Sequence, residues 1–200
     1  MVSDEKYGSR LTENSEIIYM PYKIKILNLL GLRNFLVNQP NIEAERISQV
    51  NMKAKEINQP DMKVNLVHQP EIEADEINQP NMQAKEVNQW KMKAKKVYQP
   101  NMQAEEVSQA RVEAGIIYQQ DMKAKKVYQE GMEIDELITG EKSCYGDWNL
   151  KEAKINKWTG DWVYFDKINM KDARLPSELI NVIEAQKVLM DMAESYRMIK

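Results

Sequence analysis

Glutamine occupies every tenth position from Gln39 to Gln129, and this feature constrains the fold more than any other. Through the same stretch, positions whose numbers end in 2 or 7 carry large apolar residues, and most positions ending in 4 carry alanine. More than half of the chain is therefore one short unit repeated. Such a pattern predicts a repeat architecture, in which each unit buries its apolar side chains against the next.

The spacing of the repeated positions separates strands from helices. Positions ending in 2, 4, 7 and 9 follow one another in steps of two and three residues, whereas one face of a helix needs steps of three and four. Proline, which removes a helical hydrogen bond, recurs at Pro40, Pro60, Pro70, Pro80 and Pro100. Steps of two are strand alternation, and each step of three adds a bend. The pattern predicts a β-solenoid.

Outward positions indicate that two units form one coil. Pro40, Pro60, Pro80 and Pro100 align at every second unit, and the Asn or Asp that follows each one tolerates a turn. Residues stacked one coil apart lie about 4.8 Å from each other, where opposite charges are favourable. At this double period, four acids precede four lysines: Glu71, Glu73, Asp75 and Glu76 precede Lys91, Lys93, Lys95 and Lys96. We predict a coil that is two units long and has four sides.

Units such as Met82-Gln-Ala-Lys-Glu followed by Val87-Asn-Gln-Trp-Lys resemble the pentapeptide-repeat proteins, over roughly residues 32–138. In this chain the large residue comes first in each unit and the small one second, the reverse of that family's order. The resemblance implies a right-handed quadrilateral β-helix of about five coils. A different β-helix and a trimeric intertwined spike are the alternatives. Because some members of the family act on DNA gyrase, the resemblance also implies a nucleic-acid mimic as an alternative function.

The non-repeating flanks predict caps at both ends of an all-β solenoid. We expect an N-terminal cap over residues 1–31, the solenoid body over 32–140 and an aromatic C-terminal cap over 141–175. Residues 176–200 have the apolar stripe of an amphipathic α-helix that begins near Ser177. This helix is expected to pack along the rod or to form an interface that makes the protein a homo-oligomer.

Catalytic and metal-binding groups are scarce. The chain has one histidine, His68, and one cysteine, Cys144, so it has neither a Cys/His cluster nor a phosphate loop. We therefore expect no cofactor, no metal and no enzyme activity. A carbohydrate-cleaving pair of surface carboxylates is the enzymatic alternative. The ten glutamines are expected to hold the coils in register, because a buried amide without partners costs about 1–3 kcal/mol.

Charge and hydropathy limit the partners and the compartment. The net charge of −3 gives no general attraction to nucleic acid, and the lysines have acids one coil away, so neither nucleic-acid binding nor an unbroken acidic mimic face is expected. No segment has the roughly 18 apolar residues of a membrane span. A single cysteine suits the reducing cytoplasm, and a phage or other particle component is the alternative.

The remaining exposed apolar residues predict a protein-binding surface. Tyrosine and tryptophan are frequent interface anchors, and leucine and isoleucine replace charges at two outward positions. The candidate interaction residues are Trp90, Tyr98, Tyr118, Tyr128, Leu66 and Ile116. We expect a structural or protein-interaction rod, which has a rigid binding surface and belongs to a phage or bacterial assembly. The alternative is an inhibitor or protector of a DNA-binding enzyme such as a topoisomerase.

Overall fold

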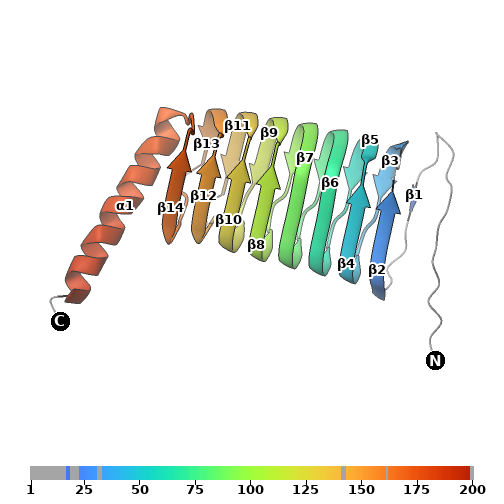
Figure 1. Cartoon of the computed structure of the whole chain (residues 1–200), viewed down its shortest axis with the longest axis horizontal. Coiled ribbons are helices and arrows are strands. Elements are labelled where there is room, and N and C mark those ends of the chain that lie inside the picture. The colour runs from blue at the N-terminus through green and yellow to red at the C-terminus, as the bar shows by residue number, and fades with distance from the viewer. Residues whose placement is uncertain (1–16, 19–22, 31–32, 141–142, 161, 199–200) are drawn as a thin grey trace.

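The computed structural model describes residues 17–18, 23–30, 33–140, 143–160 and 162–198, which form a rod of parallel strands followed by one helix (Figure 1). The elements are β1 (Ile17–Ile18), β2 (Lys23–Leu30), β3 (Arg33–Asn38), β4 (Glu43–Val50), β5 (Met52–Asn58), β6 (Lys63–Asn78), β7 (Gln83–Tyr98), β8 (Gln103–Ala110), β9 (Glu113–Gln119), β10 (Lys123–Glu130), β11 (Glu133–Thr139), β12 (Asp147–Lys151), β13 (Lys154–Thr159), β14 (Lys167–Lys171) and α1 (Ser177–Met198). The expected N-terminal cap, 1–31, lies mostly outside the described residues.

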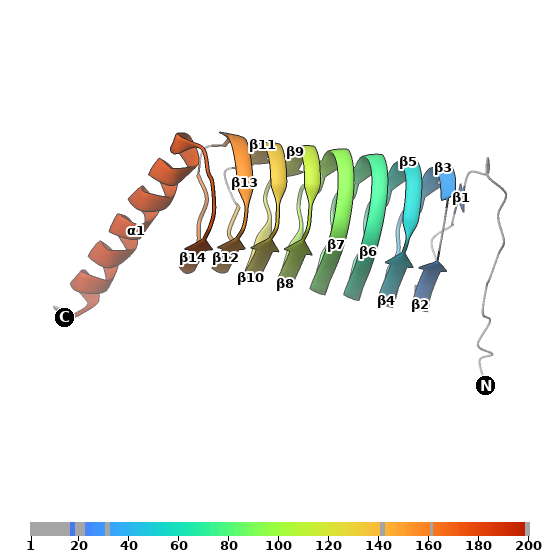
Figure 2. The same ribbon diagram turned by 45° about the horizontal axis from the view of Figure 1, so that its top comes forward.

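The strands stack in two parallel ladders on opposite sides of the rod (Figures 1 and 2). In the repeat body each residue pairs with the one two units farther along the chain, as for Glu73 with Lys93 and Val87 with Val107. This register confirms a β-solenoid whose coils are two units long. The solenoid has about seven turns, two more than the repeat alone predicts, because β1, β2 and β12 to β14 extend the ladders on both flanks.

Each coil has four turning points. At residues ending in 1, from Asn41 to Asp121, φ lies between +50° and +57°. Six of these nine residues are Asn or Asp, whose short polar side chains tolerate the left-handed region. Pairing also skips residues ending in 5, such as Asn65 and Asp75 between β6 and β7. We name the four sides of every coil A1, A2, B1 and B2, after residues 81–85, 86–90, 91–95 and 96–100 of one coil.

The core is a column of stacked apolar side chains along the axis of the rod. From Val37 to Leu137, residues ending in 2 and 7 are almost completely inaccessible, and alanines ending in 4 let opposite sides approach closely. The largest of the inaccessible aliphatic residues are Ile47, Met52, Ile57, Met62, Ile72, Ile77, Met82, Met92, Met102 and Ile117. Alternation of inward and outward side chains along each strand therefore produces both the core and the polar surface from one short unit.

The buried glutamines form one continuous hydrogen-bonded column. Gln89 Nε2 donates to Gln69 Oε1 at 2.9 Å, one coil earlier on the same side, and to Gln79 Oε1 at 3.0 Å, across the core. Gln89 Oε1 accepts in the same way from Gln99 at 3.1 Å and from Gln109 at 3.0 Å. The five amides from Gln69 to Gln109 each use both hydrogens and accept two bonds in this way. This arrangement removes the desolvation cost of burying the amides.

The glutamine column has a direction, and its two ends differ. Every amide donates toward the N-terminal end, so Gln39 Nε2 has no acceptor, and Gln119 Oε1 has no donor because Thr139 replaces the next glutamine on its ladder. The last acceptor, Gln129 Oε1, receives a hydrogen bond from Trp148 Nε1 at 2.9 Å. On the other ladder Thr139 replaces glutamine and accepts from Trp158 Nε1 at 3.0 Å. Trp148 therefore closes the column on one ladder, whereas on the other ladder Gln119 Oε1 has no donor.

The aromatic segment 141–175, expected as a cap, continues the coil after a single inserted residue. Lys126 pairs with Asp147, which is one position farther along than the repeat requires, and Asp147 pairs with Lys167 at the regular spacing again. Tyr145 and Trp148 are buried with their rings 4.8 Å apart, where the repeat body holds an alanine and a valine. Larger inward side chains therefore fill the last coils, in which the glutamine column has ended.

Helix α1 lies across the C-terminal end of the rod and not along its length (Figures 1 and 2). Leu179 and Ile183 are buried against the last coil, and Trp162 Nε1 donates to Gln186 Oε1 at 3.0 Å. Val188 and Leu189, farther along the helix, are exposed. The first half of α1 thus covers the open end of the solenoid, where unpaired core residues would otherwise meet water.

Candidate functional site

The six candidate interaction residues lie on two opposite sides of the rod. Tyr98, Tyr118 and Ile116 are on side B2, whereas Leu66, Trp90 and Tyr128 are on side A2. These sides face each other across the core, because successive glutamines of the repeat, one from each side, share hydrogen bonds between them. The structure therefore does not bring the six residues into one patch, and each side has to be considered separately.

Side B2 carries a continuous apolar surface over three successive coils. The rings of Tyr98 and Tyr118 lie 5.6 Å apart in an edge-to-face arrangement, and Tyr98 is 38% exposed. Ile116 stands beside Tyr118, and Ile138 follows Tyr118 one coil later in the same column. The sequence reasoning missed Ile138, which the coil period places in line with both tyrosines. We call Tyr98, Ile116, Tyr118 and Ile138 the tyrosine face.

Polar ladders border the tyrosine face toward the N-terminal end. Asn58 Nδ2 donates to Asn38 Oδ1 at 3.3 Å, and Asn78 Nδ2 donates to Asn58 Oδ1 at 3.2 Å. These asparagines occupy the same column as Tyr98 and Tyr118. The column therefore changes from stacked amides, which bond to each other, to aromatic rings, which leave apolar surface exposed.

Side A2 carries a smaller apolar group around Trp90, whose side chain is 50% exposed. The indole packs edge-to-face against His68 at 6.4 Å, and Pro70 lies directly beneath it. Leu66 lies on the same side, in the outward column next to that of His68. Tyr128 lies two coils farther along, so it does not join this group. His68 packs against an aromatic ring here.

Side B1 is covered by ion pairs between successive coils. Lys53 Nζ lies 3.0 Å from Glu73, Lys95 Nζ lies 2.9 Å from Asp75, and Lys91 pairs with Glu71. These contacts confirm part of the charge pairing expected between successive coils, since Glu71 pairs with Lys91 and Asp75 pairs with Lys95. The side chains are exposed, so each pair adds little to stability. Their main effect is an alternation of sign along the rod.

Lys93 departs from the expected partner. It was expected to pair with Glu73, and the two residues are neighbours in register, but Lys93 Nζ donates to Glu113 Oε2 at 2.6 Å. The hydrogen bond to Glu113 and its charge raise the Lys93 pKa above its ordinary value. Glu73 is instead bonded to Lys53 on the preceding coil. Glu73 thus pairs with only one of its two lysine neighbours, and Lys93 with only one of its two acidic neighbours.

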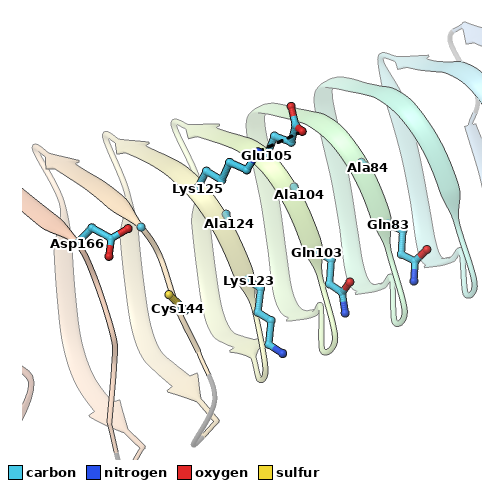
Figure 3. Close-up of a pocket in the computed structure, with 11 residues that line it drawn as sticks. Gln83, Ala84, Gln103, Ala104, Glu105, Lys123, Ala124, Lys125, Cys144 and Asp166 are labelled. Carbon is cyan, nitrogen blue, oxygen red and sulfur yellow. Dashed lines mark hydrogen bonds and ion pairs between the residues drawn. The ribbon is translucent and has the colours of Figure 1, made fainter.

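Side A1 contains a shallow groove of about 550 Å³ (Figure 3). Alanines at Ala84, Ala104 and Ala124 form its floor. Gln83, Gln103 and Lys123 line one edge in a row, and Lys125 pairs with Glu105 at 3.4 Å along the other. The groove is open along the rod and ends near the half-buried Cys144. Its side chains are spaced like the coils and do not converge on one point.

Groups suited to catalysis or metal binding do not gather in the described part of the chain. Within it, no three His, Cys, Asp or Glu side chains lie close enough together to hold a metal ion. Tyr145 is fully buried, and its burial raises the pKa of the phenol. The described helix is not long and apolar enough to cross a membrane.

Comparisons of the chain with family models, curated proteins and solved structures give no match.

Proposed function

We propose that this protein is a non-enzymatic structural rod that binds another protein through the tyrosine face. The observation that carries the proposal is the apolar surface formed by Tyr98, Ile116, Tyr118 and Ile138 over three coils of a flat side. Tyrosines present large, rigid contact area at a low cost in conformational entropy. Surfaces of this kind, rimmed by charged residues, mark protein interaction sites.

The rigidity of the rod supports this function. The coils are linked by parallel strand pairing on both sides and by the glutamine column in the middle. A surface held in this way does not need to become ordered when it binds, so little binding free energy is lost. The tyrosine face is therefore presented in one fixed geometry.

The proposal extends to the class of protein and its setting. Turning points at residues ending in 1 and 5 favour a four-sided coil, and on that basis we propose a relation in shape to the pentapeptide-repeat proteins. A rigid rod with one contact face suits a component of a phage or bacterial assembly, built in the cytoplasm. Nucleic-acid mimicry is a weaker candidate, because lysines and acids alternate along side B1 and leave no unbroken acidic row.

Site-specific photo-crosslinking tests the proposal in the cells that make the protein. A benzophenone amino acid replaces Tyr98, which is 38% exposed on the tyrosine face, or Tyr128, which is 39% exposed on the opposite side. We expect protein adducts from position 98 that position 128 does not give, with mass spectrometry identifying the adduct. The same adducts from both positions, or none from position 98, would contradict the proposal.

A further inference from the structure

We infer that the tyrosine face binds a second copy of this chain, with the two rods antiparallel and related by a two-fold axis. The inference rests on the proposed function, because it names the partner of the same surface. Three columns of outward side chains run along side B2, and residues ending in 6 form the first of them. The order of charges in this column identifies the partner.

The geometry of two facing flat sides limits the arrangements. A two-fold axis along the strand direction reverses the order of the coils but keeps each column opposite itself. If the axis passes through the coil of Ile116 and Tyr118, these residues meet the same residues of the other copy. Tyr98 then lies opposite the partner's Ile138, which stands one coil beyond the axis on the other side. The apolar surface is thus self-complementary.

Charges on both sides of Ile116 are also complementary under this rotation. The column runs Glu76, Lys96, Ile116, Glu136, Lys157 in register along the rod. Reversal places Lys96 opposite the partner's Glu136 and Glu76 opposite the partner's Lys157. A parallel arrangement has its two-fold axis along the rod, which reverses the columns, so the charged column would face the uncharged column of Pro80, Pro100, Gln120 and Gly140 and would form no ion pairs. The sequence of signs therefore favours an antiparallel copy.

The four charges differ in the contacts that they already make within the chain. Glu136 accepts a hydrogen bond from Thr159 Oγ1 at 2.8 Å and also has an ion pair. Among the described residues, Lys96 and Glu76 form no ion pair, although they are neighbours in register. Lys157 Nζ lies 2.7 Å from Glu136 within the chain. In the dimer each Glu76 and Lys96 would face a Lys157 and Glu136 pair, which gives alternating charges on both sides of the apolar centre. Such an arrangement sets the register of the two rods.

The size of the face predicts a reversible dimer. Two coils stand beyond the axis on the C-terminal side, so five coils of each copy overlap. One side of a coil is about 16 Å wide and five coils are about 24 Å long, so each copy would bury roughly 400 Å². The total of about 800 Å² lies below the usual range of stable specific interfaces and suits a weak, reversible contact. We expect dissociation in the micromolar range, with affinity that falls as salt screens the ion pairs.

Charge reversal tests the inference on the full-length protein. Light scattering and sedimentation across a concentration series measure the dissociation constant of the natural chain, of Lys96→Glu, of Glu136→Lys and of the double variant. Each single change should weaken the dimer at least about tenfold by opposing like charges, and the double change should restore it. Lys126→Glu, the same reversal at the corresponding position on side A2, is the control and should leave the dimer intact.

Three results would overturn the inference. They are a natural chain that stays monomeric up to about millimolar concentration, single reversals that leave dimerisation unchanged, or a double variant no tighter than the singles. Salt dependence of the natural dimer gives a measurement that needs no variant, and an affinity independent of salt would also overturn it. A monomeric chain that still crosslinks another protein at position 98 would remove the second copy and keep the proposed function.

Discussion

The indole Nε1 of Trp148 lies 2.9 Å from Oε1 of Gln129 and ends the glutamine column inside the rod. Every amide before it donates toward the N-terminus. The oxygen of Gln129 therefore has no following glutamine to donate to it and needs another donor. An indole meets this need because it donates one hydrogen bond and accepts none. Trp148 is therefore the residue at which a polar core changes into an aromatic one.

Removal of this donor should destabilise the fold. Trp148→Phe keeps an aromatic ring but leaves a buried carbonyl oxygen on Gln129 without a partner. We expect a loss of about 1–3 kcal/mol in the free energy of unfolding, measured in urea. Trp162→Phe is the control, because its partner Gln186 is only half-buried and can bond to water. Equal losses in the two variants would argue against a terminating role for Trp148.

The direction of the hydrogen bonds in the glutamine column predicts that glutamine-to-leucine substitutions at two positions lower the free energy of unfolding by different amounts. Gln89→Leu takes an acceptor from Gln99 and from Gln109, and each of them keeps a buried N–H without a partner. Gln119→Leu removes an amide whose oxygen already lacks a partner. It orphans no donor, because nothing donates to that oxygen.

We therefore expect Gln89→Leu to cost at least about 2 kcal/mol more than Gln119→Leu, since each buried unsatisfied donor costs about 1–3 kcal/mol. Thermal and urea unfolding of both variants measure the difference. Equal costs would show that burial alone, and not the direction of the hydrogen bonds, determines the stability of the column.

The turning points at which φ is positive predict a stabilising substitution. Arg111 has φ of +54°, a conformation that asparagine adopts more readily than arginine does, and asparagine or aspartate stands at most equivalent corners. We expect Arg111→Asn to raise the free energy of unfolding by about 0.5–1 kcal/mol, and Arg111→Val, with its branched Cβ, to lower it. Melting temperatures check this order. A higher melting temperature for the valine variant than for the asparagine variant would contradict the role of the left-handed backbone conformation at this turning point.

Ion pairs between coils predict a loss of stability in acid. Lys154 Nζ donates to Glu133 Oε1 at 2.7 Å, and this bond and the lysine charge lower the Glu133 pKa below its ordinary 4.5. The folded chain thus binds this proton less readily than the unfolded chain. The stabilisation is present above the unfolded pKa and is lost as pH falls through the lowered pKa.

Glu133→Gln should make the melting temperature fall less steeply in acid, measured between about pH 3 and 7. High salt should flatten the profile of the natural chain in the same way, because the pair is exposed and screened. Identical acid profiles for the variant and the natural chain would show that this pair does not contribute.

Most of the fold follows from short-range patterns that a single sequence displays. Alternating apolar residues at positions such as Met82 and Val87 specify which side chains face inward, and the sign of Glu71 against Lys91 specifies the length of the coil. The added C-terminal turns are harder to predict from the sequence, because Leu150 and Ile168 keep the inward spacing but lack the glutamine that marks the repeat body. One inserted residue before Cys144 also shifts the numbering by which the repeat is recognised.

The candidate surfaces depended more on the tertiary structure. The coil period places Tyr98 and Tyr118 in one column, but the division of the six candidates between two opposite sides becomes visible only when the coil closes. Lys93 lies between two equivalent neighbours, Glu73 and Glu113. Which of the two it pairs with depends on the local positions of all three side chains.

The amino-acid sequence alone determined the strand periodicity, the length of the coil and the inward position of the glutamines, because these depend on side-chain type at regular spacing. Only the tertiary structure decided that Gln89 bonds both to Gln69 on its own side and to Gln79 across the core, and that Trp148 ends the column. The reason is physical: a hydrogen bond needs a donor and an acceptor in contact, and contacts across the core exist only after both halves of each coil have folded.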